Sequence, residues 1–481
     1  MSAVEREGRP APAAVAETHS AVLFFVGDRA YKMKKPVDLG FLDFTDRAAR
    51  QRACLDEVAL NSRLAPTSYL GVADVIGPDA LPCEHLVIMR RMPEERRLSA
   101  CVARGEDVDD ALRSIARSLA ALHDASPPDA VHDRLGTAAS VRARWEAGFE
   151  QLADVRELDG SDEAAIERDQ RIAELVRRYL VGRADLFEHR IRRGRIRDGH
   201  GDLQADDIFL VDEGPQILDC LEFAEDLRWG DVLSDVAFLA MDLERLGHPE
   251  LGAQLLRCHA EYAGDTWPAS LGHHYVAYRA HVRAKVGVLR ARQDRRAPDA
   301  GTDALFDLAL RHLEQGRVRL VVVGGPPGTG KSTVAAGLAE RLDAVVLRTD
   351  EARTAPMDER YAPAEVRATY ERVLTDAERL LRRGEHVVID ATFGDPAVRA
   401  LVRQVAEGTA SDLTELRCAA PVEVAAARVA QRVAVGGDPS EATPEIARRL
   451  ADGFAPWPES VVLRTEAPAA EVVDAAVAAV G

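Results

Sequence analysis

The sequence has no apolar run of about 18 residues, the length that a membrane-spanning helix requires. Its first 20 residues also lack the basic start and the apolar stretch of a signal peptide. The six cysteines show neither a CxxC pair nor the spacing of zinc ligands, which argues against a disulfide framework and against a zinc site. We therefore expect a cytoplasmic protein with no membrane partner.

Positive charge is also scarce. Lys and Arg number 62 against 80 Asp and Glu, which gives a formal net charge of −18. Proteins that bind nucleic acid gain much of their affinity from Lys and Arg at phosphates, so no nucleic-acid partner is expected. The 481 residues exceed the roughly 250–300 that one hydrophobic core serves, and two or three domains are expected.

The first part of the chain predicts a small lobe of strands and one helix. Residues 1–20 are rich in Ala, Pro and Glu and have no apolar periodicity, so we expect a disordered tail. Two apolar runs, 21–26 and 29–33, flank Gly27-Asp28 and predict a β-hairpin. The expected elements after the hairpin are a helix over 46–65 and a strand over 86–92.

Helical signals dominate the middle of the chain, interrupted by short apolar strands over 206–211 and 216–223. Residues 295–302 combine charge with Pro and Gly, which indicates a linker. Five apolar strands then alternate with helical segments, a pattern typical of a parallel, doubly wound sheet. The predicted strands are 319–325, 344–350, 386–392, 413–419 and 460–465. The predicted domains are a small lobe over 21–94, a large and mostly helical lobe over 95–300, a linker helix over 301–317 and an α/β domain over 318–481.

The α/β domain opens with a phosphate-binding loop. The strand 319–325 runs directly into a G-x4-G-K-S sequence, and a helical segment follows. Glycines let backbone N–H groups surround a phosphate at the helix N-terminus. Lys331 is expected to reach the β- and γ-phosphates of ATP, and Ser332 to ligate Mg²⁺. An ordinary Gly-rich turn would leave this Lys-Ser pair unexplained. The predicted nucleotide-binding residues are Gly325, Pro326, Pro327, Gly328, Thr329, Gly330, Lys331, Ser332 and Thr333.

Acidic residues end the next two strands of this domain, where ligands of open α/β sheets collect. Asp350 begins a D-x-x-R sequence, and we expect it to take the proton of an acceptor hydroxyl. Arg353 would hold an anionic group of the acceptor or orient Asp350. Asp390 is expected in the Mg²⁺ shell. The alternative for either Asp is a helix N-cap.

Two arginines, Arg428 and Arg432, lie four residues apart on one predicted helical face. Such a pair can close over the phosphates and stabilise charge in the transition state; the alternative is a solvated helix face. Together with the loop and the two strand-end Asp residues, they make 318–465 resemble the small P-loop kinases related to gluconate kinase, polynucleotide kinase and zeta toxin. The resemblance implies ATP and Mg²⁺ as cofactors.

A second group of carboxylates lies in the large lobe, near two short apolar strands. Carboxylates at the ends of two strands can converge on a metal-bound phosphate, as phosphoryl transfer requires. Asp202, in His-Gly-Asp, would orient the acceptor hydroxyl. Asp207 and Asp219 would hold Mg²⁺, and Glu222 is a candidate for an extra ligand.

This segment resembles the aminoglycoside phosphotransferase family, whose H-G-D-x4-N sequence and following I-D strand correspond to it. The resemblance implies a protein-kinase-like α+β fold, in which Lys32 contacts the ATP phosphates and Glu57 is its ion-pair partner in a helix. Lys34 and Lys35 lie at the same strand end, and a solvated basic strand tip is the alternative for Lys32. The chain departs from the family at Asp207, where the family has Asn, and in its short start before the hairpin.

The order of parts resembles bacterial proteins in which an aminoglycoside phosphotransferase-like domain precedes a P-loop domain. This implies a phosphotransferase with two Mg·ATP sites that passes the γ-phosphate to a small hydroxylated metabolite. Two alternatives stay open. One is a nucleotide-gated regulatory protein with a degenerate N-terminal kinase domain. The other is a toxin-like kinase of a nucleotide-sugar. Phosphorylated product separates the first and third hypotheses from the second.

Overall fold

The computed structural model describes residues 14–18, 20–38, 43–159, 163–294, 298–353, 362–435 and 444–481. They pack as two compact units, each built from several segments of the chain. The first contains residues 1–140, 190–266 and 275–309, and the second contains residues 141–189, 267–274 and 310–481. The expected division at the 301–317 linker helix therefore differs from the packing, because two helical segments of the large lobe pack with the P-loop segment.

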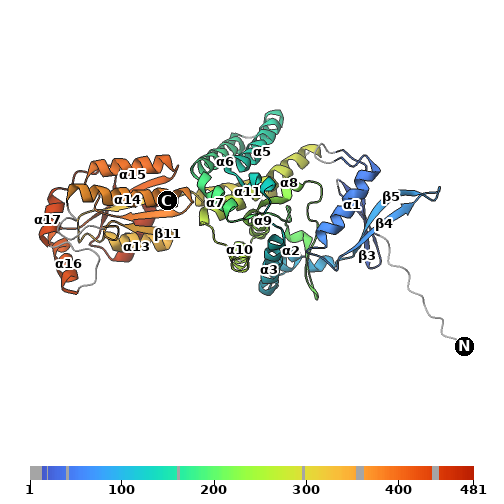
Figure 1. Cartoon of the computed structure of the whole chain (residues 1–481), viewed down its shortest axis with the longest axis horizontal. Coiled ribbons are helices and arrows are strands. Elements are labelled where there is room, and N and C mark those ends of the chain that lie inside the picture. Colours follow the sequence, from blue (N-terminus) through green and yellow to red (C-terminus); the bar gives the residue numbers. More distant parts are fainter. Residues whose placement is uncertain are drawn as a thin grey trace. The chain divides into compact units, whose positions relative to one another are not determined.

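An antiparallel five-stranded sheet forms the small lobe of the first unit, with strand order β1-β2-β3-β5-β4. Helix α1 (Arg47–Asn61) lies beside it (Figure 1), and Asp46 caps this helix by accepting a hydrogen bond from the backbone N–H of Ala49. The predicted hairpin is confirmed, since β2 pairs with β3 around Gly27, whose φ is +58°. The strands are β1 (Ala14–Glu17), β2 (Ala21–Val26), β3 (Arg29–Lys34), β4 (Tyr69–Ile76) and β5 (Pro82–Arg90).

The prediction of a disordered tail over residues 1–20 is wrong for the segment that forms β1. This strand pairs antiparallel with β2, with Ala14 opposite Phe25 and Glu17 opposite Val22. All four of its side chains are exposed, so it carries none of the apolar alternation that a half-buried strand shows. Residues 1–13 lie outside the described part of the chain.

The large lobe places its short strands around the His-Gly-Asp segment. The strand expected over 216–223 ends at Ile217, and the backbone then turns at Asp219, whose φ is +63°. The strands are β6 (Ile196–Asp198), β7 (Ile208–Val211), β8 (Gly214–Ile217) and β9 (Trp229–Asp231). The helices and 3-10 turns of this unit are η1 (Glu94–Arg96), α2 (Leu98–Ala103), α3 (Asp109–Ala125), α4 (Ala130–Asp133), η2 (Arg134–Gly136), η3 (Ala205–Asp207), α8 (Glu225–Arg228), α9 (Val232–Arg245) and α10 (Pro249–Ala263).

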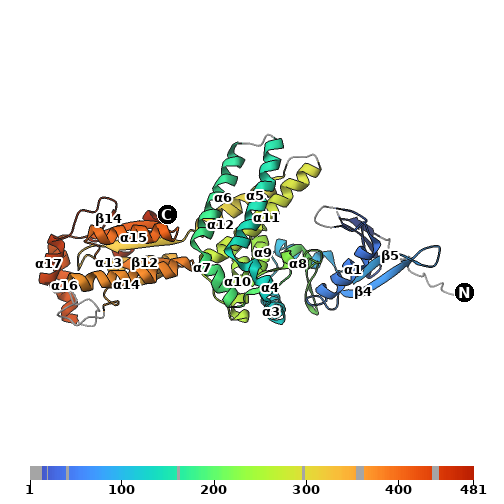
Figure 2. The same cartoon turned by 45° about the horizontal axis from the view of Figure 1, so that its top comes forward.

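Several long helices belong wholly or partly to the second unit (Figure 2). Four of them contain a boundary between the units: α5 (Ala138–Asp159), α7 (Ala184–Arg192), α11 (Ala269–Gln293) and α12 (Ala300–Gln315). A fifth, α6 (Glu163–Gly182), lies entirely in the second unit. No helix in the described ranges is both long and apolar enough to cross a membrane.

The P-loop part of the second unit is a parallel sheet with strand order β11-β12-β10-β13-β14, which confirms the predicted parallel α/β domain. Its strands are β10 (Arg319–Gly324), β11 (Ala344–Arg348), β12 (His386–Asp390), β13 (Asp412–Ala419) and β14 (Val461–Arg464). The helices are α13 (Lys331–Leu342), α14 (Pro363–Arg382), α15 (Pro396–Gly408), α16 (Val422–Val435), α17 (Pro444–Asp452) and α18 (Ala469–Val480).

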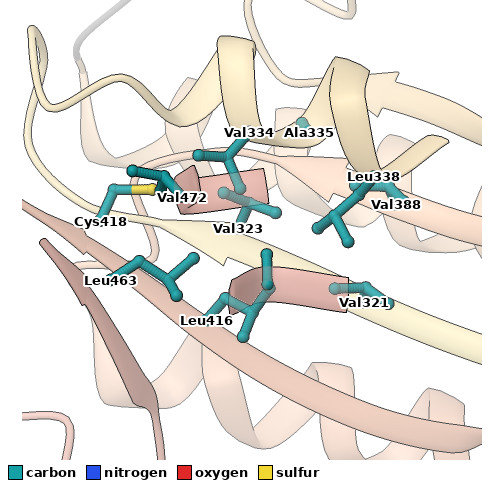
Figure 3. Packing of buried hydrophobic residues seen from close by; sticks show 11 residues of the cluster. Val321, Val323, Val334, Ala335, Leu338, Val388, Leu416, Cys418, Leu463 and Val472 are labelled. Atoms are coloured by element: carbon teal, nitrogen blue, oxygen red, sulfur yellow. The ribbon is translucent and has the colours of Figure 1, made fainter. Parts of the chain in front are cut away.

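The central strand β10 lies between β12 and β13. The chain builds β11 and β12 on one side of β10 and then β13 and β14 on the other side, so the direction in which the sheet grows changes at β10. A crevice outside the carboxyl ends of the strands at such a point is where open α/β sheets bind ligands. One face of the sheet packs against α13 through Val323, Val334 and Leu338, among other buried apolar residues (Figure 3). This core fixes the helix that starts at the phosphate-binding loop.

Candidate active sites

The N-terminal candidate site is organised by a buried aspartate of α9. Asp235 accepts hydrogen bonds from the backbone N–H groups of His200 and Gly201, each at 2.9 Å. Its Oδ2 also lies 3.1 Å from Nε2 of His123 in α3. Burial alone would raise the pKa of Asp235, but the hydrogen bond from His123 and the neighbouring His200 outweigh it and hold the pKa below its usual value. Asp235 therefore fixes the loop that carries Asp202.

A second acid of α9 holds the other end of this loop. Asp242 is buried and accepts a hydrogen bond of 2.9 Å from the backbone N–H of Ala205. Asp235 and Asp242 were not identified from the sequence. Their signal is a pair of acidic residues, seven positions apart, in the mostly apolar stretch 232–243, since an acidic residue in such a stretch needs a buried partner.

Asp202, Asp207 and Asp219 lie close enough to perturb one another. Burial raises the pKa of Asp207 well above its usual value, and repulsion from Asp219 and Asp202 adds to the effect. Burial likewise raises the pKa of Asp202, which accepts a hydrogen bond of 3.0 Å from Gln204. Like charges held together in this way favour a cation between them, so the predicted Mg²⁺ ligands suit the metal. Within the described ranges, no three acidic, His or Cys side chains are already gathered as a metal cage.

The structure brings the predicted phosphate lysine and its partner together. Nζ of Lys32 lies 2.9 Å from Oε1 of Glu57 and 2.7 Å from Oδ1 of Asp219. Burial lowers the pKa of Lys32, but attraction by Asp219 and Glu57 outweighs burial and leaves it well above its usual value. Attraction by Lys32 in turn lowers the pKa of Asp219. The ammonium group of Lys32 on β3 thus contacts side chains from two other parts of the chain, α1 and the segment after β8.

Lys34, two residues along the same strand, reaches the same carboxylate from the other side. Its side chain is 1% exposed, and its Nζ lies 2.6 Å from Oε2 of Glu57. It also forms an ion pair with Glu222. Glu222, a candidate for an extra metal ligand, is thus held by Lys34 instead. Lys35 lies apart from this cluster and contacts Glu17 of β1.

Helix α1 also holds the segment that carries Asp219. The side-chain oxygen of Asn61 accepts a hydrogen bond of 2.8 Å from the backbone N–H of Cys220. The hydroxyl of Tyr69 accepts a bond of 3.3 Å from the N–H of Asp219 itself. These contacts maintain the left-handed backbone at Asp219, which non-glycine residues adopt only at a cost.

In the P-loop domain, glycines are required where the loop passes other backbone segments. A Cβ atom at Gly328 would lie 2.2 Å from the carbonyl oxygen of Ala425, and one at Gly325 would lie 2.5 Å from that of Cys418. Gly330 ends the loop in a left-handed conformation as the N-cap of α13. Lys331 then starts the helix. The predicted strand, loop and helix are therefore all present.

The predicted metal and acceptor residues of this domain lie at the carboxyl edge of the sheet. Asp390 ends β12; burial raises its pKa, while Lys331 and a hydrogen bond with Ser332 oppose the rise. Asp350 forms an ion pair of 3.1 Å with Arg353. Asp390 therefore lies beside the residues that would bind the phosphates and Mg²⁺.

Of the two predicted lid arginines, Arg428 has a described side chain and Arg432 does not. Arg428 donates from Nη2 to the backbone oxygen of Thr465 at 2.8 Å, and Thr465 lies against Gly330 of the phosphate-binding loop. Arg428 is therefore tied beside the loop through Thr465. The side chain of Arg432 lies outside the described part of the chain.

The sequence did not lead us to Arg399 of α15, although this residue holds the loop after β12 in place. It is buried and donates to the carbonyl oxygens of Phe393 and Pro456 at 2.8 and 2.7 Å. Its guanidinium also lies 4.7 Å from the ring centre of Trp457. Thr392, in the pinned loop, accepts a 3.0 Å bond from the N–H of Gly325. Arg399 therefore supports the phosphate-binding loop indirectly.

Comparison with known proteins agrees with this geometry. Residues 38–271 match the phosphotransferase enzyme family, and residues 320–457 match an AAA domain family. An uncharacterized protein of Mycobacterium tuberculosis is 44% identical over 471 residues, which cover 94% of this chain and 92% of that protein. The chain belongs to the same family of two-domain proteins. A protein of Mycobacterium bovis matches this two-domain kinase with the same identity and coverage.

Two solved structures are similar to part of the two-domain kinase. A choline/ethanolamine kinase family protein from Mesorhizobium loti is 14% identical and covers 63% of this chain and 88% of that chain, with a TM-score of 0.40. A gluconokinase from Sinorhizobium meliloti is 20% identical and covers 34% and 91%, with a TM-score of 0.26. The family assignment rests on the mycobacterial relatives. The match to the phosphotransferase enzyme family identifies the chain as a kinase or phosphotransferase.

Proposed function

We propose that both domains bind Mg·ATP and that at least one of them transfers the γ-phosphate of ATP to a small hydroxylated metabolite. The observation that carries this proposal is the convergence of Lys32, Glu57 and Asp219 with two further carboxylates, Asp202 and Asp207. A lysine, its helix partner and a group of acids are the parts that phosphoryl transfer needs around the nucleotide and the acceptor.

In the N-terminal domain, Lys32 would bind the ATP phosphates while Glu57 keeps it in place. Asp207 and Asp219 would hold Mg²⁺, which when bound neutralises charge on the phosphates. Asp202 would orient the acceptor hydroxyl and receive its proton at a carboxylate oxygen. The raised pKa of Asp202 brings it nearer to the range in which a carboxylate acts as a base.

In the C-terminal domain, the backbone N–H groups of the loop 325–332 would surround the phosphates at the start of α13. Lys331 would bind the β- and γ-phosphates, and Ser332 with Asp390 would hold Mg²⁺. Asp350 would receive the acceptor proton, oriented by its ion pair with Arg353.

A regulatory role for the N-terminal domain is the second candidate, and one contact favours it. Asp219, a predicted metal ligand, has one oxygen 2.7 Å from Nζ of Lys32. Phosphates at Lys32 and a metal at Asp219 would compete with this pair, and a separation of the two side chains would change the conformation of the segment around Asp219. A protein that binds ATP here without transferring phosphate would use that change as its output.

The test is an acceptor screen with the full-length protein, labelled ATP and Mg²⁺. We expect labelled metabolite from the wild type, and single losses of about 10²–10⁴-fold in the transfer catalysed at the affected site for Asp202→Asn and Asp350→Asn. Asp206→Asn is the matched control, because Asp206 is an exposed neighbour of the site. ATP binding without labelled product in any acceptor pool would favour the regulatory role.

A further inference from the structure

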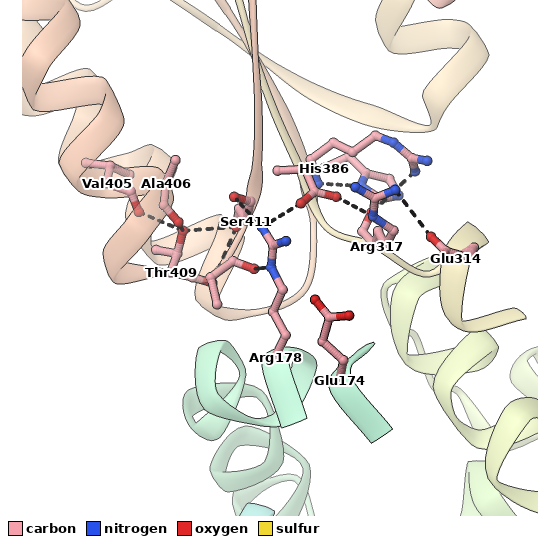
Figure 4. Close-up of polar contacts among 12 residues, drawn as sticks. Glu174, Arg178, Glu314, Arg317, His386, Val405, Ala406, Thr409 and Ser411 are labelled. Atoms are coloured by element: carbon pink, nitrogen blue, oxygen red, sulfur yellow. Dashed lines mark hydrogen bonds and ion pairs between the residues drawn. The ribbon is translucent and has the colours of Figure 1, made fainter. Parts of the chain in front are cut away.

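A cluster of arginines in the second unit lies where α6 and the following residues meet the amino-terminal edge of the parallel sheet (Figure 4). Arg178 comes from α6, and Arg183 follows that helix. Arg317 precedes β10, and Asp412 is the first residue of β13. None of these residues belongs to either candidate active site.

Arg183 is the most buried member of the cluster, with 1% of its surface exposed. It donates to the carbonyl oxygens of Gly182 and Thr409 at 2.9 and 2.5 Å, and more weakly to the hydroxyl of Ser411 at 3.4 Å. Its Nε has no hydrogen-bond partner, and no described carboxylate forms an ion pair with it. Burial lowers the pKa of Arg183 to about 10. A guanidinium this deeply buried normally has an anionic partner.

The neighbouring charges do not supply that partner. Asp412 is already shared by two other arginines, with Oδ1 at 2.5 Å from Arg178 and Oδ2 at 2.6 Å from Arg317. Three guanidinium groups therefore surround one carboxylate. Glu314 also pairs with Arg317, at 3.2 Å, but it lies 2.7 Å from Arg171 as well. The inner part of the cluster keeps an excess of positive charge.

A small cavity of about 20 Å³ lies among these groups. Its polar lining includes Arg178, Arg183, Arg317, Tyr179, Ser270 and Asp412. A volume of about 10–15 Å³ accommodates one water molecule, so this cavity is large enough for a particle of water or halide size. The excess charge favours an anion over water. The ring of Tyr179, whose centre lies 5.7 Å from the guanidinium of Arg183, balances the charge of Arg183 only in part.

We propose that this cavity binds one monovalent anion of halide size, for which chloride is the probe. The anion would lie among the guanidinium groups of Arg178, Arg183 and Arg317 and balance the charge of the cluster. Because Arg178 and Arg183 belong to the helical segment, whereas Ser411 and Asp412 belong to the sheet, the anion would bind both sides of their contact. It would thereby stabilise the packing of the helical segment against the P-loop domain, independently of phosphoryl transfer.

The first test is calorimetric unfolding of the full-length protein in sodium chloride and in sodium methanesulfonate at equal ionic strength, since methanesulfonate is a larger anion of the same charge. We expect the unfolding equilibrium constant of this unit to fall about tenfold when chloride exceeds its dissociation constant tenfold. Arg183→Met should abolish the difference between the salts. Arg177→Met is the matched control, because Arg177 is an exposed arginine of α6 that pairs with Glu146, and it should retain the difference.

The second test needs no variant and covers the case in which Arg183→Met fails to fold. Crystals of the wild-type protein grown in sodium bromide should show an anomalous peak in the cavity, within hydrogen-bond distance of Arg183. A water molecule at that position, or equal unfolding in both salts, overturns the proposal.

Discussion

Replacing Asp235 by Asn is the sharpest test of how the N-terminal catalytic loop is held. Each carboxylate oxygen of Asp235 accepts one backbone bond of 2.9 Å, from His200 or Gly201. Asn has a single acceptor oxygen, so at least one of these buried N–H groups loses its partner. A hydrogen bond to a charged group contributes about 1.5–3 kcal/mol, and the unfolding equilibrium constant should therefore rise roughly 10- to 150-fold.

The effect should also depend on pH. The folded-state pKa of Asp235 lies below its usual value, so its contribution to stability is complete above the unfolded pKa of about 3.9 and is lost as pH falls towards the folded value. The difference between Asp235→Asn and the wild type should thus be full at pH 7 and should shrink below about pH 4.

Hydrogen exchange followed by mass spectrometry on the full-length protein measures directly how firmly Asp235 holds the backbone N–H groups of this loop. Peptides that contain residues 200 and 201 should exchange faster in Asp235→Asn, while peptides of the P-loop sheet should be unchanged. Asp124→Asn is the control, because Asp124 is exposed in α3 beside His123. Unchanged exchange at residues 200 and 201, with unchanged urea unfolding, would refute the assigned role of Asp235.

Three further predictions concern both sites. Lys331→Ala should abolish most ATP binding at the C-terminal site without unfolding the domain, and calorimetric titration that finds unchanged affinity there would contradict the assignment. Asp207→Asn should raise the melting temperature at neutral pH without Mg²⁺, because the raised pKa of Asp207 means that its ionisation opposes folding as pH rises; added Mg²⁺ should stabilise the wild type more than the variant, and equal shifts would argue against a metal site. Arg399→Met should weaken ATP binding through the loop at Thr392, with affinity partly restored in Arg399→Lys, and a loss of stability alone would reduce Arg399 to a packing role.

The central strands β10 and β12 of the P-loop sheet could be predicted because both of their faces are buried, so each reads as a short apolar run. Val321 and Val388, for example, are 1% and 0% exposed. The phosphate-binding loop could be predicted because its function requires consecutive residues. By contrast, β1 is an exposed edge strand with no periodic signal. Strand β4, at the opposite edge of the same sheet, was not predicted either, and half of its residues are only partly buried.

The candidate N-terminal site was predictable only where its residues share one short segment. Asp202, Asp207 and Asp219 lie within 18 positions of one another, so the sequence shows them together. Their supports come from distant positions: Asp235 lies in α9, and Lys34 contacts Glu222 across 188 residues. Such pairs depend on tertiary packing, which local periodicity does not encode.

The sharing of Glu57 by two lysines also constrains how this protein can evolve. A neutral residue at position 57 would leave two ammonium groups, those of Lys32 and Lys34, without their common carboxylate. Loss of Lys34 alone would in turn leave Glu222 unpaired. Each single substitution would thus lower stability by leaving a buried charge without its partner, whereas replacing the whole group together would not. Positions 32, 34, 57 and 222 should therefore vary together or not at all among descendants of this chain.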